Sequence, residues 1–315
     1  MLSRVAESLM WMARYLERAN SLSRIVEAVE EFSLDHHHPE LSNEEAFWSP
    51  VYDVLNLSDQ KECYIKEENE LSIIHHLLLD RDNMSSVASC IAAARFNARG
   101  VRDQIMDEAW EVINDLHLYC KEQGESNEDV NVAEFGAKIR HSVLCFRGLV
   151  CSTMEQTEAW GFLLLGMRIE RADQTSRLLD LQTFMLASDR RSKGLLEPYL
   201  WLIVLKVSSG NTTGFASSKS YWKKIENSLL FDVVQPNSIR SLVSKVNDML
   251  HHLSGARPGI VSNEAEQACS LLQADLDLKA LTGLDEEDLH QYIDRVQQGL
   301  VEISNAILQE YIYIS

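Results

Sequence analysis

The sequence has 315 residues, of which 45% are hydrophobic, so that the chain can fill a substantial core. It contains only 13 Gly and 5 Pro, which argues against a fold built from tight turns and hairpins and against extensive disorder. Its formal net charge of −19 would repel a phosphate backbone, and we therefore expect no nucleic-acid partner.

The cysteines and the apolar segments give no sign of a secreted or membrane protein. Six cysteines lie far apart with no C-x-x-C pair, as is typical of reduced thiols in the cytosol. Charges at Arg4, Glu7 and Arg14 interrupt the apolar core that a signal peptide needs, and the longest apolar run, 199–205, is too short to cross a bilayer. We expect a cytoplasmic location and no contact with a membrane.

The first half of the chain is predicted to be helical, with one long linker. Apolar residues in steps of three and four predict a helix from Ser3, as N-cap, to about residue 30. A polar linker with three histidines follows at 36–38, and residues 48–52 indicate a turn region. A shorter helix is expected at about 70–79, and the sustained helical period over 85–121 predicts one long helix.

The second half continues the helical pattern, and no strand-like alternation interrupts it. A polar loop is predicted at 122–129 and a Gly/Ser/Thr-rich loop at 208–220. The predicted fold class is therefore all-α, a large helical bundle. Helices are expected at about 132–154, 157–188, 195–208, around residue 221, and at 238–254, 263–281 and 286–311.

Two of the predicted helices repeat one motif. Residues 164–180 align with residues 11–27 without a gap, and each segment contains Glu-Arg-Ala followed by Ser and Arg. The repeated residues are Glu17/Glu170, Arg18/Arg171, Ala19/Ala172, Ser23/Ser176 and Arg24/Arg177. The offset of 153 residues is close to half the chain and predicts an internal duplication: a single helical domain, 1–315, with related halves of about 1–150 and 151–315.

Charged residues form stripes along these two helices, according to the geometry of an ideal α-helix. A solvated face, a buried polar network between the halves, and a site for a ligand or partner are all open interpretations. Repetition of the same groups favours the network over plain surface. The first stripe is Glu7, Arg14 and Arg18; the second is Glu17 and Arg24, mirrored by Glu170 and Arg177.

Other residues with chemical potential are fewer. Arg95, Arg99 and Arg102 share one edge of the helix predicted at 85–121, where they would grip a carboxylate or phosphate or form a neutralised basic rim. The histidines lack the spacing of a zinc helix, and we expect no metal. The sequence contains no nucleophile motif and no nucleotide-binding loop, so no cofactor is predicted.

The start of the chain, residues 1–20, together with 93–115 and 165–180, resembles the bacterial alpha-E family. The likeness extends weakly to 220–231 and 235–243, so that it covers nearly the whole chain. Alpha-E proteins are helical, and the resemblance implies a genetic association with an ATP-grasp protein and, as a further partner, a transglutaminase-like protein. That setting implies peptide or amide-bond synthesis.

The resemblance also marks positions in this chain that match the family's characteristic residues, without giving any of them a catalytic role. They are Glu7, Arg14, Glu17, Arg18, Asn97, Arg99, Arg102, Trp110, Asn114, Glu170, Arg171, Asp173 and Arg177.

This chain departs from the family pattern at Phe96, where an acidic residue is usual, and at Met167, where an Arg is usual. Met167 is the counterpart of Arg14 in the repeat, so we expect an anion-binding group of the second half to be missing or displaced. A site would then draw mainly on the stripe of the first half.

Three functional hypotheses follow. The leading one is an accessory or co-catalytic helical partner that docks an ATP-grasp amidoligase and helps to present its acceptor. The second is an independent enzyme that uses the Glu/Arg stripes as acid/base and anion-binding groups. The third is a purely structural scaffold.

Overall fold

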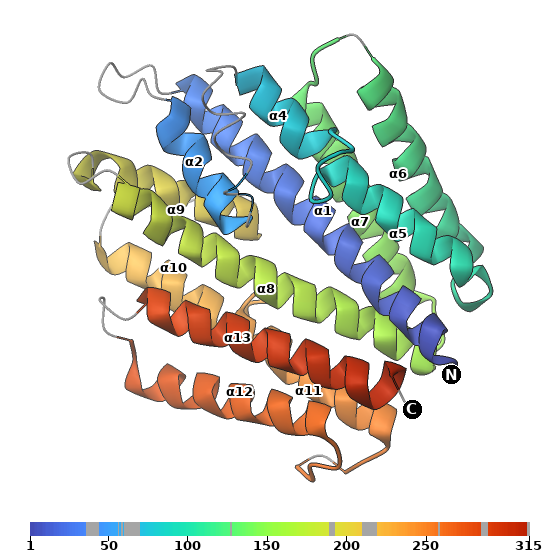
Figure 1. Ribbon diagram of the computed structural model, residues 1–315. Helices are drawn as coiled ribbons and strands as arrows, with labels where there is room; N and C mark the ends of the chain where they lie inside the picture. The colour runs from blue at the N-terminus through green and yellow to red at the C-terminus, as the bar shows by residue number, and fades with distance from the viewer. Residues whose placement is uncertain are drawn as a thin grey trace.

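The computed structural model describes residues 1–35, 44–55, 57, 59, 70–126, 128–188, 193–209, 219–257, 259–284 and 289–313. The regular structure in these residues is entirely helical, so the protein is all-α, as predicted (Figure 1). No helix in this part of the chain combines the length and the apolar character that crossing a bilayer requires. The predicted linker at 36–38 and most of the predicted loop at 208–220 lie outside the described residues.

The helix boundaries follow capping residues that the sequence provides. Ser86, Asn131, Ser238 and Asn263 each accept a hydrogen bond from the backbone N–H three residues later. In chain order the elements are α1 (Ser3–Asp35), α2 (Glu44–Val54), α4 (Glu70–Leu78), α5 (Val87–Gly100), the 3₁₀ turn η1 (Arg102–Gln104), α6 (Asp107–Glu125), α7 (Val132–Ser152), α8 (Glu158–Ser188), α9 (Lys193–Ser209), α10 (Lys219–Phe231), α11 (Ile239–Ser254), α12 (Glu264–Thr282), α13 (Leu289–Ile307) and the π-helical turn η3 (Leu308–Ile312).

The prediction of one helix over 85–121 is wrong, because the chain breaks between α5 and α6. Gly100 ends α5, and Val101 leaves helical geometry with φ −130°. Glycine weakens a helix, and Asp107 and Glu108 favour a new start, since their carboxylates lie at the positive N-terminus of α6. The apolar period continues across the break and therefore concealed it.

The turn region predicted at 48–52 is also wrong. These residues belong to α2, which contains Pro50 in its interior. Proline removes a backbone donor and normally interrupts a helix. Here Trp48 and Tyr52 are both fully buried, and the burial of these large rings outweighs the helix-breaking tendency of Pro50.

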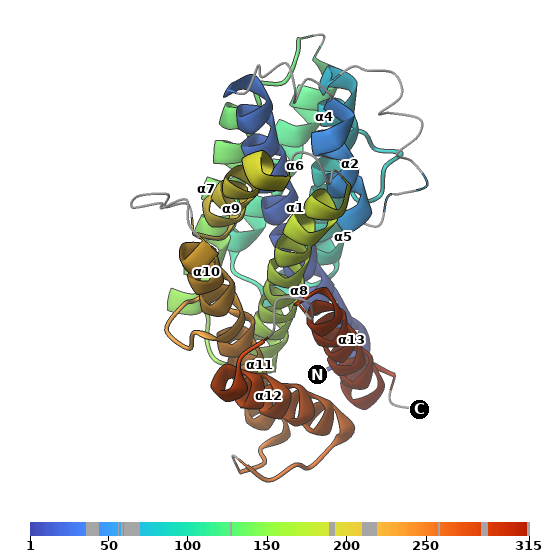
Figure 2. The same cartoon turned by 90° about the vertical axis from the view of Figure 1, so that its left-hand side faces the viewer.

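The two Glu-Arg-Ala helices, α1 and α8, run side by side through the middle of the molecule (Figures 1 and 2). They run in the same direction, and they cross closely at Gly166. A Cβ atom there would collide with the carbonyl oxygen of Met10 and lie 3.1 Å from the Cβ of Ala13. Glycine at this position therefore lets the two backbones come together.

Other helices cover α1 and α8 on several sides. α5 and α7 pack on α1, while α2, α11 and α13 pack on α8, and α9 contacts both. Gly136 permits a further close contact, because a Cβ there would lie 2.8 Å from Oε2 of Glu27 on α1. Charged groups on α1 and α8 consequently lie inside the bundle. The origin of the two halves by duplication stays a prediction.

Candidate functional site

Glu170 lies on α8 at its contact with α1, and its side chain has no exposed surface. Arg14 Nε donates a hydrogen bond to Glu170 Oε2 at 2.8 Å. Arg18 donates from Nε to Oε1 at 2.8 Å and from Nη2 to Oε2 at 3.2 Å. Gln174 Nε2 donates to Oε1 at 3.0 Å. We call Glu170, Arg14, Arg18 and Gln174 the Glu170 cluster. Both oxygens of the Glu170 carboxylate accept hydrogen bonds within it.

The electrostatics of the Glu170 cluster favour the ionised pair. Burial alone would raise the pKa of Glu170, but the charges and hydrogen bonds of Arg18 and Arg14 hold it below the ordinary value. Burial likewise disfavours the charged form of Arg18, yet the Glu170 carboxylate more than offsets this and raises the Arg18 pKa. The Glu170 cluster is thus a closed network, in which both arginines hydrogen-bond to the one carboxylate.

Glu17, the repeat counterpart of Glu170, has a different partner. It is 3% exposed, and Arg147 of α7 binds both of its oxygens, from Nε to Oε1 at 2.6 Å and from Nη2 to Oε2. Arg171, the counterpart of Arg18, instead donates to Oδ1 of Asn237 and to the Pro236 carbonyl oxygen at 3.4 Å. Arg147 therefore supplies the donors that Met167, a buried apolar residue, does not.

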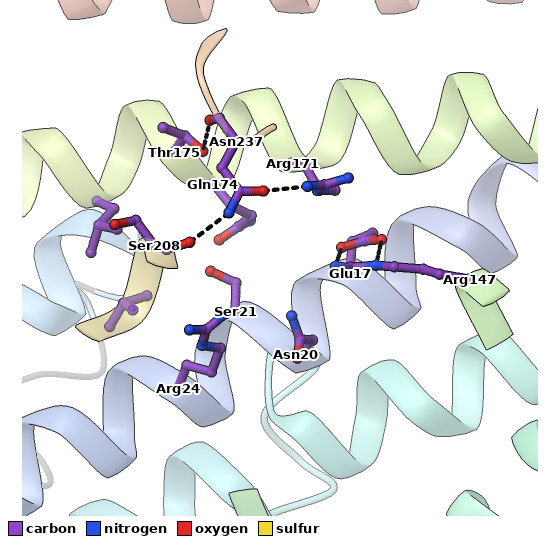
Figure 3. A pocket seen from close by; sticks show the side chains of 12 residues that line it. Glu17, Asn20, Ser21, Arg24, Arg147, Arg171, Gln174, Thr175, Ser208 and Asn237 are labelled. Carbon is purple, nitrogen blue, oxygen red and sulfur yellow. Dashed lines mark hydrogen bonds and ion pairs between the residues drawn. The ribbon is translucent and has the colours of Figure 1, made fainter. Parts of the chain in front are cut away.

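A cavity of about 460 Å³, counted to its open mouth, lies beside the Glu17–Arg147 pair (Figure 3). Side chains from α1 and α8 enclose it from opposite sides, with the Glu17–Arg147 pair toward one end. Three guanidinium groups and one carboxylate line it, which leaves an excess of positive charge inside an acidic protein. Its lining comprises Glu17, Asn20, Ser21, Arg24, Arg147, Arg171, Gln174, Thr175, Leu178, Val207, Ser208 and Asn237.

Two of these arginines have only neutral hydrogen-bond partners among the described residues. Arg24 Nη2 donates to the Lys206 carbonyl oxygen at 2.8 Å. Burial lowers the pKa of Arg24 to about 10, and the positive charges of Arg140 and Arg147 contribute to the decrease. Burial also lowers the pKa of Arg171, an effect that nearby Glu17 partly opposes. These two cations lack the carboxylate hydrogen bonds that Arg14 and Arg18 have.

Asn237, in the turn before α11, fixes one wall of the cavity (Figure 3). Its Oδ1 accepts from Arg171, and its Nδ2 donates to the Ser208 carbonyl oxygen at 2.5 Å. Its own carbonyl oxygen accepts from the Thr175 hydroxyl at 3.1 Å. One residue thereby joins α8 to the end of α9 and orients the Arg171 guanidinium.

A second cavity, of about 560 Å³ to its open mouth, is lined by Arg18, Leu22, Leu55, Ser85, Asp173, Gln174 and Arg177. Five of these residues have a counterpart, 153 residues away in the repeat, that lines the first cavity. The pairs are Arg18/Arg171, Leu22/Thr175, Asp173/Asn20, Gln174/Ser21 and Arg177/Arg24. Arg177 is paired with Asp173 at 2.7 Å, and Arg18 with Glu170. In the second cavity each cation has a carboxylate.

The remaining predicted site residues do not line either cavity. Asn97 donates to the Ala93 carbonyl oxygen of its own helix, and Arg99 is exposed. Arg102 lies in the turn η1, where it contacts exposed Asp107 at 3.6 Å. The arginine edge predicted on one continuous helix is therefore split by the break at Gly100. Glu7 is half-buried on α1.

The sequence interpretation missed Arg147, Gln174 and Asn237. One signal was present: Arg140 and Arg147 lie seven residues apart on α7, a spacing that places them on one helix face. Both point to α1, where Arg140 binds Glu27 and Arg147 binds Glu17. Asn237 follows Pro236 in a turn and carries no pattern that predicts its contacts.

Another cluster missed from the sequence lies apart from the cavities. His290 Nδ1 lies 2.6 Å from Asp180 Oδ1, and its Nε2 lies 3.8 Å from Asp294 Oδ2. One potential metal-ligand atom from each of these residues lies within 4.8 Å of the others. The pKa of Asp180 is raised by burial despite the histidine. Because Asp294 is more than half exposed, we interpret the cluster as ion pairing.

A model of the Alpha-E family, described as "a predicted alpha-helical domain with a conserved ER motif", matches residues 1–312. An uncharacterized protein of Mycobacterium bovis is 22% identical over 268 residues, and two of Mycobacterium tuberculosis are 22% and 21% identical. Each match covers 80% of this chain but only 30% of the relative. No solved structure matches.

Proposed function

Because this chain belongs to the Alpha-E family, we propose that it is a helical accessory protein of an ATP-grasp amidoligase in a bacterial amide-bond-forming system. We further propose that it contributes by holding an anionic group of the reactants in the cavity beside Glu17. The observation that carries this proposal is that Arg24 and Arg171 line the cavity without a carboxylate hydrogen bond in the described part of the chain.

The charge in the cavity favours an anionic ligand. Burying a cation that bonds no carboxylate is unfavourable. Burial is the main cause that lowers the pKa of both arginines, and the nearby carboxylates of Glu27 and Glu17 only partly oppose it. A carboxylate or phosphate oxygen in the cavity would accept charge-assisted hydrogen bonds from planar guanidinium groups. Asn20 and Ser21 also line the cavity and offer an amide and a hydroxyl donor.

The same geometry favours binding over self-sufficient catalysis. A glutamate that acts as a general base needs a carboxylate oxygen that is free to accept a proton near neutral pH. Arg147 occupies both oxygens of Glu17, and the Glu170 carboxylate is saturated by Arg14 and Arg18. Neither Glu is therefore suited to proton transfer, which supports the accessory role over the independent enzyme.

The partner is proposed on the family resemblance. The matched segment is less than a third of each mycobacterial relative, so in those proteins it is joined to other segments in one chain. ATP-grasp chemistry activates a carboxylate as an acyl phosphate. A second protein that fixes an anionic group near that intermediate would orient the reactants and limit hydrolysis.

Co-expression with an ATP-grasp protein, which the family resemblance implies is encoded beside this chain, tests the proposal. We expect the two proteins to co-purify, and we expect acceptor-dependent ADP release to increase when this chain is added. Arg171→Gln should reduce that increase while co-purification persists, whereas Lys279→Gln, on α12 away from the cavity lining, should not. Failure to co-purify, together with unchanged ADP release, would contradict the accessory role.

A further inference from the structure

Trp110, in the first turn of α6, brings together two arginines that the helix break at Gly100 separates along the chain. The guanidinium carbon of Arg95, on α5, lies 5.6 Å from the centroid of the Trp110 ring, and that of Arg102, in η1, lies 5.2 Å from it. Arg95 Nε also donates a hydrogen bond to Asn114 Oδ1 at 2.9 Å. The contacts of one tryptophan therefore gather both arginines where α5 packs on α6.

Arg99 and Phe96 extend this group over the exposed side of α5. Arg99 follows Arg95 by four residues and Phe96 by three, spacings that place side chains next to one another on a helix surface. Arg99 is exposed, the side chain of Arg102 is 58% exposed, and Phe96 is 80% exposed. We call Arg95, Phe96, Arg99, Arg102 and Trp110 the α5–α6 surface; these helices lie at one edge of the molecule (Figure 1).

The arginines of the α5–α6 surface have few counter-charges. α5 contains no Asp or Glu, and neither Arg95 nor Arg99 hydrogen-bonds to a carboxylate in the described part of the chain. Arg102 has two exposed acidic neighbours in the chain, Asp103 and Asp107, and only Asp107 contacts it, at 3.6 Å. Water and salt weaken such an exposed pair. The three guanidinium groups therefore keep N–H donors for an external acceptor.

The acidic residues of α6 lie on a different face from Trp110. At 100° per residue, exposed Glu108, Glu111 and Asp115 are about 100–160° from Trp110 around the helix axis. Asn114, which binds Arg95, is only about 40° from Trp110. The α5–α6 surface is thus a short positive strip that is bordered by acidic residues.

We infer that the α5–α6 surface docks an acidic segment of a partner protein. Carboxylates of that segment bind Arg95, Arg99 and Arg102, and an apolar side chain of the segment covers Phe96. Arginine and aromatic residues are enriched where proteins meet, and a guanidinium held against an aromatic ring still offers its N–H edge to a carboxylate.

The charges favour a short acidic segment over nucleic acid. A continuous phosphate backbone would extend past the strip onto the acidic face of α6, and the net charge of −19 would repel it. The inference goes beyond the proposed function, because no residue of α5 or α6 lines either cavity. It adds a separate docking surface to the anion site.

Fluorescence anisotropy with labelled peptides tests the inference. The probe is a short peptide of Glu and Leu, and two matched peptides replace every Glu by Gln or every Leu by Gly. We expect the Glu/Leu peptide to bind the wild-type chain about tenfold more tightly than either matched peptide at low ionic strength. Added salt should weaken its binding. Equal affinity for the Glu/Leu peptide and either matched peptide would overturn the inference.

Variants at exposed positions identify where the peptide binds. Arg99→Gln and Phe96→Ser should each weaken binding of the Glu/Leu peptide about threefold. Arg257→Gln and Leu281→Ser, at exposed positions outside the α5–α6 surface, are the matched controls and should not weaken it. Circular dichroism establishes that each variant is folded. Unchanged affinity in Arg99→Gln or in Phe96→Ser would overturn the inference.

Two further outcomes separate this surface from the anion cavity and from a nucleic-acid site. Arg171→Gln should leave the affinity for the Glu/Leu peptide unchanged. A loss as large as that in Arg99→Gln would mean that the peptide binds at the cavity, which would overturn the inference and leave the anion site intact. A labelled oligothymidylate that binds more tightly than the peptide, and is weakened by Arg99→Gln, would overturn the inference in favour of nucleic acid.

Discussion

The Glu170 cluster and the surroundings of Glu17 start from the same motif but differ in whether their arginines hydrogen-bond to a carboxylate. Arg14, Arg18 and Gln174 saturate Glu170, and no cation in that cluster lacks an anion. Around Glu17 a single arginine from α7 takes both carboxylate oxygens, and Arg171 faces the cavity instead. A buried ion network is structural when each of its cations hydrogen-bonds to a carboxylate, and it can become a binding site when some of its cations do not.

One residue accounts for much of this difference. Met167 is the repeat counterpart of Arg14, and its side chain is buried in the hydrophobic core. Arg147 compensates for the charge of Glu17 from another helix, so that Arg171 is no longer required there. Four experiments test this contrast between a closed and an open cluster.

Glu170→Gln should produce the largest loss of stability. It leaves Arg14 and Arg18 buried against a neutral amide, and breaking a buried pair in this way lowers the free energy of unfolding by about 3–5 kcal/mol. Urea denaturation measures the change. Glu155→Gln, at an exposed position, is the matched control and should change it by less than about 0.5 kcal/mol. A loss below about 1 kcal/mol for Glu170→Gln would contradict a closed, structural cluster.

The stabilising effect of Glu170 should disappear in acid. Its pKa in the folded state lies below the ordinary value of a glutamate, so the folded state binds fewer protons than the unfolded state. The stabilisation is therefore fully present above the unfolded pKa and is lost as pH falls through the folded one. We expect urea unfolding to show that the free energies of unfolding of wild type and Glu170→Gln differ at pH 7 and become more similar below about pH 4.5. A constant difference would exclude an ionised Glu170.

Gly166→Ala should disturb both clusters by separating α1 from α8. The added methyl group collides with the Met10 carbonyl oxygen, and such overpacking lowers stability by about 1–3 kcal/mol. Gly148→Ala is the matched control, since a Cβ there meets nothing within 4 Å; that change should raise stability by about 0.5–1 kcal/mol. Equal effects of the two substitutions in thermal unfolding would show that the crossing is loosely packed.

The repeat counterparts Arg18 and Arg171 should differ most clearly from each other. Arg18→Gln removes hydrogen bonds to a buried carboxylate and should lower the free energy of unfolding by about 1.5–3 kcal/mol. Arg171→Gln removes a desolvated charge without a bonded carboxylate and should change it by less than about 0.5 kcal/mol. Urea denaturation of both variants compares them. Similar losses would mean that the cluster at Glu17 is as closed as that at Glu170.

The sequence predicts the helical class and most helix positions because apolar periodicity and caps are local signals. α7, α8 and α11 begin within one residue of the predicted starts. The break at Gly100 and the helix through Pro50 were missed, because they depend on packing against residues that are distant in sequence. Glu17 and Glu170 are both buried, and the polar-network interpretation that the repeat favoured stays a prediction.

The partners of those two carboxylates were not predictable from spacing along a helix. Arg147 is 130 residues from Glu17, and Arg14 is 156 residues from Glu170. Helical periodicity shows which face a residue occupies but not which helix packs on that face. The cavity depends on the long-range contacts of three residues, Arg147, Arg171 and Asn237. It can therefore be recognised only in the folded chain.

The most direct test of the central claim is the dependence of unfolding free energy on inorganic phosphate at constant ionic strength. A ligand that binds only the folded state raises the free energy of unfolding by about 1.4 kcal/mol when its free concentration is ten times its dissociation constant. We predict such stabilisation for the wild type and for Lys279→Gln, and its loss in the double variant Arg24→Gln/Arg171→Gln. Equal stabilisation of the double variant, or none in the wild type relative to chloride, would contradict an anion site beside Glu17.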